Sequence, residues 1–173
     1  KALEEAQILK LLTLEIPDGD DSESTTAASG KLKLDCSQLL PLQLVKDHCG
    51  VAGVKLNVTD FEKETNCNRK YGHPDNFGGL VFIVTQYNDM NMATQAVKAK
   101  LEDEDLDSKA IKNLGDLASI VTVGEDLFLS VAHKNYLLEL RSSNGVGPQG
   151  TCCVCLDDEK LKFLAKNVLE QLP

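Results

Sequence analysis

The sequence predicts an α+β domain in which helices cover the apolar face of an antiparallel β-sheet. The first observation is the stretch 114–142, which reads as a meander of three short strands joined by two tight turns. The second is a series of segments before and after this stretch whose apolar residues recur at helical spacing. Connections as short as those in the meander force antiparallel neighbours, because a parallel return needs a crossover of roughly a dozen residues.

The middle strand of the meander shows the alternation of a half-buried strand. Leu127, Leu129 and Val131 share one face, and polar or smaller residues are interleaved with them. Turn-forming residues bound this strand, at 124–126 before it and at 133–135 after it. The meander is therefore expected to be the scaffold of the sheet.

Residues 1–31 are expected to stand apart from a single domain at 32–173. Ala2 to Leu14 has the apolar stripe of a short amphipathic helix, and Asp18 to Gly30 has the polar composition of a mobile linker. The first 30 residues hold seven acids and two lysines, a net charge of −5, so the rest of the chain carries −4 of the total of −9. This composition suits a tether that precedes a compact domain.

Periodicity and turn residues place the remaining elements of the domain. The acidic run at 102–107 is interpreted as a solvated helix end rather than a metal site, because its carboxylates are adjacent instead of convergent. The expected elements are a helix at 37–48 with Pro41 in its first turn, strands at 54–58, 66–71 and 80–87, a loop at 73–79, a helix from Asn88 or Asn91 to about Asp103, a loop at 142–150, a short strand at 151–156 and a closing helix from Asp157.

The overall charge and hydropathy exclude two classes of partner. A net charge of −9 and a pI near 4.8 argue against nucleic acid, which requires a basic face. No apolar run approaches membrane-spanning length. Membrane contact is therefore expected only through a lipid anchor or signal segment upstream of Lys1.

Cysteine is the residue type that carries the most information. Six cysteines are more than an ordinary cytosolic domain carries, so we expect export to the periplasm or cell envelope and disulfide bonds. Six cysteines allow fifteen connectivities, so the pairing stays open, although we favour Cys36 with Cys67 and Cys49 with one of the terminal trio. The disulfide candidates are Cys36, Cys49, Cys67, Cys152, Cys153 and Cys155.

The terminal cysteine trio also permits two other kinds of site. Cys152 and Cys155 form a C-x-x-C just before the closing helix, where a thiolate is favoured, as a redox pair or half of a zinc site requires. A thioredoxin-like redox pair would need a βαβ context, but this one follows a meander. A zinc site would need a second close pair of ligands, and His48 with Cys49 is the only adjacent pair.

A small basic and aromatic cluster is the second candidate site. Arg69, Tyr71, His73 and Phe77 precede and enter the loop at 73–79, where they could recognise an acidic or planar ligand. A solvated loop with one anchoring aromatic is the plainer interpretation. No nucleophile motif, phosphate loop or HExxH motif is present, so we name no catalytic residue and expect no cofactor or metal.

Short motifs from Cys36 onward match a known layout. They are a cysteine before a helix at 35–40, a second cysteine at Cys67, a Leu-Gly-Asp-x-Ala turn at 114–118 and a Leu-Ala-x-x-Val-Leu-x-x-Leu helix at 164–172. The chain thereby resembles small exported lipoproteins of the bacterial cell envelope, many of unknown function, with a PsbP-like sandwich. The Cys-Cys-x-Cys cluster departs from that pattern. The resemblance implies an exported binding domain and carries over no catalytic residue.

Two functions follow from these observations. The first is a non-enzymatic, exported domain of the cell envelope that binds a protein or a small-molecule ligand. The second is a thiol-dependent redox or zinc-binding protein that uses Cys152, Cys153 and Cys155. An enzymatic function has no supporting feature in the sequence.

Overall fold

The computed structural model describes residues 34–49, 51, 54–61, 67–72, 78–147, 150–153, 155 and 157–173. Of 145–147 and 150–153 it describes the backbone alone. The helix and linker expected within 1–31 lie outside the described residues.

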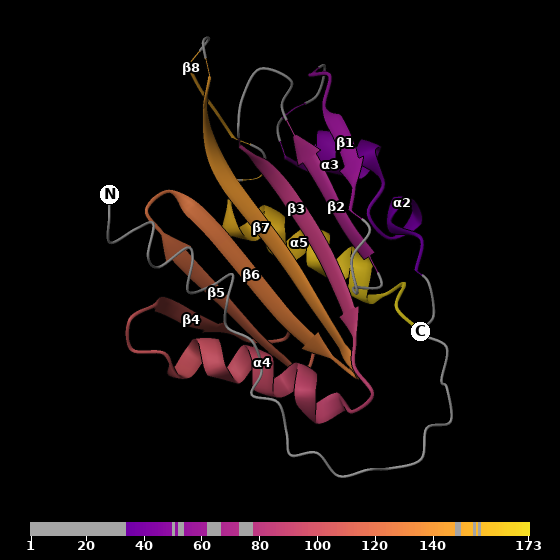
Figure 1. Ribbon diagram of the computed structural model, residues 1–173, viewed down its shortest axis with the longest axis vertical. Coiled ribbons are helices and arrows are strands. Elements are labelled where there is room, and N and C mark those ends of the chain that lie inside the picture. The colour runs from indigo at the N-terminus through magenta and orange to yellow at the C-terminus, as the bar shows by residue number, and fades with distance from the viewer. Residues whose placement is uncertain are drawn as a thin grey trace.

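An antiparallel sheet forms the centre of the molecule (Figure 1). Its strands follow the order β1-β2-β3-β7-β6-β5-β4, and β8 pairs with the far end of β7. Strands β4 to β7 are the expected meander with one more strand added at its start. The strands are β1 (Asn57–Asp60), β2 (Cys67–Gly72), β3 (Gly79–Gln86), β4 (Asp107–Ile111), β5 (Leu117–Val123), β6 (Asp126–His133), β7 (Tyr136–Gly147) and β8 (Gly150–Cys153).

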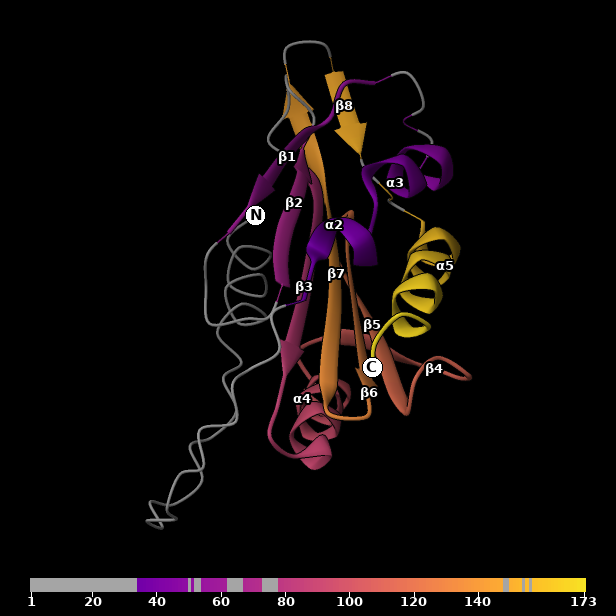
Figure 2. The ribbon, with the colours of Figure 1, turned by 90° about the vertical axis from the view of Figure 1, so that its right-hand side faces the viewer.

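Helices lie on both faces of this sheet (Figure 2). On one face are α2 (Cys36–Leu39), α3 (Leu42–His48) and α5 (Asp158–Leu169), and α5 crosses β6 and β7. On the other face α4 (Met90–Glu102) packs against β4 to β7. The expected α+β class is confirmed, and helices cover both faces of the sheet.

The main core fills the space between the sheet and α5. Alternate residues of β3 and β7 point to this side, and the register sets Phe82 beside Leu140 and Val84 beside Leu138, all with no solvent exposure. Leu161 and Leu164 of α5 pack against the same core and are fully buried. Burying a side chain of this size contributes about 1.5–3 kcal/mol, so this layer dominates the stability of the fold.

The opposite face combines a small apolar contact with a buried charge network. Ala93 and Val97 of α4 pack on the sheet at helical spacing, and the next inward residue is Lys100. The Lys100 ammonium donates to Ser130 Oγ at 2.8 Å and to Glu139 Oε1 at 2.6 Å. Arg141 Nη2 donates to the other Glu139 oxygen at 3.0 Å. These hydrogen bonds compensate for the desolvation of the buried charges.

Two expected elements near the amino end are wrong in detail. The helix expected at 37–48 is two helices, separated by Leu40 and Pro41. Leu40 lies outside the helical region, with φ −134° and ψ 83°, because a residue before proline is driven out of that region. The strand expected at 54–58 begins at Asn57 and ends at Asp60.

Two other differences concern polar segments that form strands. Residues 107–111 begin at the end of the acidic run and pair with β5 as β4, where no strand was expected from the sequence. The loop expected at 142–150 is instead the end of β7 and the start of β8, paired from Asn144 with Cys153 to Gly147 with Gly150. Both segments are strands because of their backbone pairing, since their side chains carry no alternating apolar pattern. The helix expected from Asn88 or Asn91 begins after Asp89, whose carboxylate accepts from Asn91 N–H at 2.9 Å.

Candidate functional site

Two disulfide bonds join the helical layer to the rest of the domain. Cys36 bonds to Cys67 and Cys49 bonds to Cys155, with Cα–Cα distances of 5.5 and 4.4 Å. The first is the pair that we favoured, and the second joins Cys49 to one of the terminal trio as expected; both indicate an oxidising compartment. Cys155 is therefore no free thiol for a C-x-x-C site, and the side chains of Cys152 and Cys153 on β8 lie outside the described residues.

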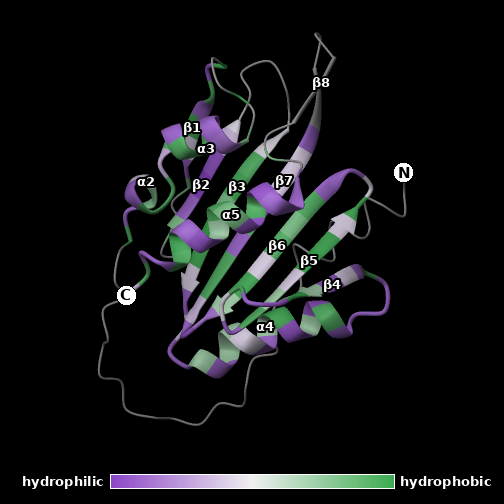
Figure 3. Cartoon of the chain, turned by 180° about the vertical axis from the view of Figure 1, so that it is seen from behind, coloured by the Kyte–Doolittle hydropathy of each residue, from purple (hydrophilic) through white to green (hydrophobic). Residues whose placement is uncertain are grey.

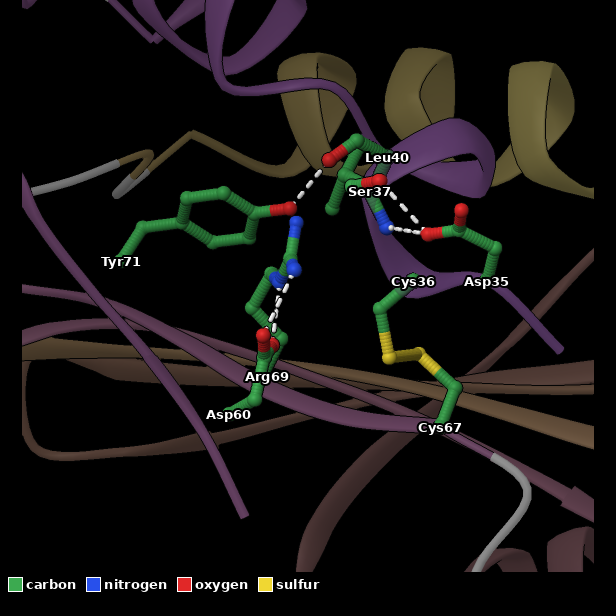
Figure 4. The surroundings of a disulfide bond; sticks show 8 residues. All are labelled: Asp35, Cys36, Ser37, Leu40, Asp60, Cys67, Arg69 and Tyr71. Atoms are coloured by element: carbon green, nitrogen blue, oxygen red, sulfur yellow. Dashed lines mark hydrogen bonds and ion pairs between the residues drawn. A yellow bond between two sulfur atoms is a disulfide. The ribbon is translucent and has the colours of Figure 1, made fainter. Parts of the chain in front are cut away.

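The side chains around the first disulfide serve the fold (Figure 4). Arg69 binds Asp60 of the neighbouring strand with two parallel hydrogen bonds of 2.5 and 2.7 Å. The Tyr71 hydroxyl donates to the Leu40 carbonyl oxygen, which connects β2 to the break between α2 and α3. Burial raises the pKa of Tyr71 to about 12, and the bond to Arg69 lowers the pKa of Asp60.

Only two of the four residues expected to bind a ligand near the loop lie in the described part of the chain. Arg69 and Tyr71 lie on β2, just before the expected loop, and both make hydrogen bonds with groups of the domain itself. His73 and Phe77 lie outside the described residues. The described members of this cluster are tied into the fold, and their role toward a ligand stays a prediction.

A groove between β4 and the side of α5 is a stronger candidate. Figure 3 shows this face of the sheet, where α5 crosses the middle and β5 and β4 extend beyond it. The groove has a volume of about 660 Å³, with Ile120 and Leu114 at its floor and Phe163, 40% exposed, on its rim. Its lining residues are Lys109, Ala110, Ile111, Lys112, Leu114 and Ile120 from the sheet side and Asp158, Glu159, Lys162, Phe163 and Lys166 from α5.

The charges around this groove are opposite in sign to those of the whole chain. Four lysines and two acids line it, a net of +2, whereas the protein carries −9. Lys162 binds Asp158 at 2.9 Å and Glu159 at 2.7 Å, which raises the pKa of Lys162. The two acids of the lining are therefore already engaged by a lysine.

The other three lysines form the cationic part of the groove. Lys109, Lys112 and Lys166 are exposed, and none makes an ion pair with another residue that the structure describes. An acidic group in the groove would find these ammonium groups beside an apolar floor. Such a floor lowers the local dielectric and strengthens the attraction.

The groove also lies beside an unpaired edge of the sheet. β4 is the last strand in the order, so among the residues that the structure describes only one of its two edges is paired with a neighbour. Open edges are surfaces to which another extended chain can bind. The groove therefore combines an apolar floor, lysines without an ion-pair partner among the described residues, and the backbone groups of an edge strand.

Sequence reasoning did not identify this groove, although one residue hinted at it. Phe163 lies off the stripe of Leu161, Leu164 and Val168 in the closing helix, so a large apolar side chain was bound to face away from the core. The positions of the lysines in the sequence did not indicate a groove. Lys109 and Lys166 lie far apart in the sequence, and only the tertiary fold brings them to the same groove.

Other kinds of site have less support. Among the described residues, no three His, Cys, Asp or Glu side chains gather where they could hold a metal ion. In the same part of the chain, no helix has both the length and the apolar composition to cross a membrane. Comparisons with protein-family models, curated proteins and solved structures find no match to this chain.

Proposed function

We propose that this protein is a non-enzymatic, exported binding domain of the cell envelope, and that its β4–α5 groove binds an acidic segment of a partner protein. The observation that carries this proposal is the presence, around an apolar floor in an otherwise acidic chain, of three lysines that make no ion pair with the described residues. Charge complementarity of this kind selects a partner and speeds its association.

The disulfides support export. Structural disulfides persist outside the reducing cytosol, and the two described here fix α2, α3 and the start of α5. The resemblance to envelope lipoproteins points to the same compartment. The acidic composition of residues 1–31 suits a tether between an upstream anchor and the domain.

The chemistry of the groove favours binding over catalysis. Its titratable residues are four lysines and two carboxylates, and the carboxylates are engaged by Lys162. The described residues of the lining include no histidine, cysteine, serine or tyrosine that could serve as a nucleophile or general base. A protein segment suits the site better than a small molecule, because the site is an open groove along a strand edge.

Charge reversal tests this proposal. The probe is a fluorescent ten-residue peptide that alternates Glu and Val, and fluorescence anisotropy measures its binding to the intact protein. The triple variant Lys109→Glu, Lys112→Glu and Lys166→Glu should lose at least tenfold in affinity, and added salt should weaken wild-type binding. The control variant Lys55→Glu with Lys98→Glu changes two lysines outside the groove and should bind like wild type. Equal binding by the triple variant and the wild type would reject the groove as the site.

A further inference from the structure

We infer that the partner segment binds as an added β-strand, hydrogen-bonded to the open edge of β4 at Ser108 and Ala110. This inference rests on the proposed function and specifies how the same groove is occupied. The added strand would continue the sheet beyond β4 and place alternate side chains beside α5.

The two-residue turns of the meander determine which backbone groups face this edge. The β5–β6 turn leaves Val123 paired with Asp126, and the β6–β7 turn leaves His133 paired with Tyr136. In a hairpin with a two-residue loop, the pair that flanks the loop is a hydrogen-bonded pair, and such pairs alternate along the strands. The odd-numbered residues of β5 therefore bond to β6, and Ala118, Ile120 and Thr122 direct their backbone groups to β4.

The same alternation continues onto β4. Asp107, Lys109 and Ile111 are the partners of those three residues and bond to β5. The backbone groups of Ser108 and Ala110 consequently point away from the sheet. Ser108 N–H already donates to the Leu106 carbonyl oxygen at 2.9 Å. The edge therefore offers the Ser108 carbonyl and both the N–H and the carbonyl of the exposed Ala110.

Side-chain direction places the lysines where they can meet such a strand. Lys109 and Ile111 pair with Ile120 and Ala118, so they lie on the α5 side of the sheet and line the groove. An added strand would present every second side chain to that side, at intervals of roughly 6.6 Å. Acidic side chains at those positions would face Lys109 in the groove that Lys112 and Lys166 also line.

The same lysines argue against a second copy of this chain as the occupant. Two β4 edges that paired with each other would bring Lys109 and Lys112 of both copies into one small area. Like charges at a strand edge are a common device against self-association. Because the chain has no ion-pair partners for these lysines among its described residues, an acidic segment from another protein fits the edge better.

Two modified peptides test strand addition directly. In one, every Val amide of the ten-residue Glu/Val peptide is N-methylated, and in the other every Glu amide is. Only one set of amides in an added strand faces β4, so one peptide should lose at least tenfold in affinity while the other binds like the unmodified peptide. Equal binding of the two methylated peptides would overturn the inference.

Substitution of Ala110 provides the protein side of the test. Ala110→Pro removes the outward N–H, and the domain should still fold because proline is tolerated at a strand edge. Ala110→Pro should lower the affinity for the unmodified peptide at least tenfold. Ala110→Val keeps the N–H and should leave the affinity unchanged. Wild-type affinity in a folded Ala110→Pro variant would count against strand addition.

The results separate this inference from the proposed function. If charge reversal abolishes binding but both methylated peptides bind equally, the groove remains the site and strand addition is wrong. If the unmodified peptide does not bind at all, both proposals fail. If sedimentation shows a dimer that Ala110→Pro dissociates, a second copy is the occupant and the acidic partner is wrong.

Discussion

Gly115 holds the turn before β5 in a conformation that other residues adopt only at a cost. Its φ is +63°, and a Cβ there would lie 2.5 Å from the Ala132 carbonyl oxygen and 2.6 Å from Val131 Cγ1. The turn is fixed on both sides, because Asp116 N–H donates to the same carbonyl at 2.8 Å and Asp116 Oδ2 accepts from Lys134 N–H at 2.6 Å. The Leu-Gly-Asp motif is therefore a structural requirement.

Replacing this glycine should destabilise the domain measurably. Gly115→Ala adds both a strained φ and a steric overlap, which together should cost about 2–4 kcal/mol. Gly124→Ala is the matched control, because Gly124 also has a positive φ of 60° but lies in an exposed turn. Urea denaturation compares the two, and equal losses would show that the close approach to Ala132 has no effect.

Glu139 is the residue through which pH should act on stability. Burial alone would raise its pKa, but the charges of Lys100 and Arg141 more than offset burial and hold the pKa below its ordinary value of 4.5. A carboxyl whose pKa is lower in the folded protein stabilises the fold above its unfolded pKa. That stabilisation is lost as the pH falls from about 4.5 through the folded value.

The charge network predicts a contrast between single and double variants. Lys100→Met leaves a buried carboxylate with only Arg141 and should cost about 3–5 kcal/mol. Adding Glu139→Leu should recover most of this loss and flatten the acid limb of the stability curve. Urea denaturation between pH 3 and 7, read for both variants and the wild type, is the measurement. A single variant as stable as wild type would contradict the role given to the network.

At the scale of elements, the disulfides fix the two short helices α2 and α3, which are not part of the sheet. α2 and α3 are short, and short helices depend on tertiary contacts for stability. Cys36–Cys67 fixes α2 to β2, and Cys49–Cys155 fixes the end of α3 just before α5. The helical layer over this face is therefore tied covalently to both the sheet and the closing helix.

The two disulfide bonds should contribute different amounts to the free energy of unfolding. Their sequence separations are 106 residues for Cys49–Cys155 and 31 for Cys36–Cys67. By chain entropy, replacing the first pair with serine should cost about 5 kcal/mol and the second about 4 kcal/mol. Urea denaturation of the two double-serine variants measures the difference, and a reductant should erase it. A reversed order would show that native-state contacts outweigh chain entropy here.

Periodic elements could be predicted from the sequence, and polar elements could not. The meander and α5 carry strong apolar patterns, so their existence and type were clear. β4 has the sequence Asp-Ser-Lys-Ala-Ile and no fully buried residue, so only its backbone pairing with β5 identifies it. The groove depends on that same strand. Its lysines could not be grouped from the sequence, because α5 joins them through tertiary packing alone.

At the scale of the whole molecule, the sheet contains two kinds of strand pairing: between neighbours in sequence and between strands far apart in sequence. Strands β4 to β7 pair with their neighbours in sequence, through turns of a few residues. β3 pairs with β7 across α4 and three further strands, as Gly79 opposite Ser143 shows. The groove is at one edge of this sheet, and β1 and β2 lie at the other.

This order of strands has a consequence for a chain that emerges from a ribosome or an export channel, amino end first. β3 would leave the channel with Leu80, Phe82 and Val84 on it, and its second partner, β7, would follow only after α4 and the first three meander strands. Until then one edge of an apolar strand stays open, which is the condition that favours aggregation. The interval between the emergence of β3 and β7 is therefore when this protein would most need a chaperone.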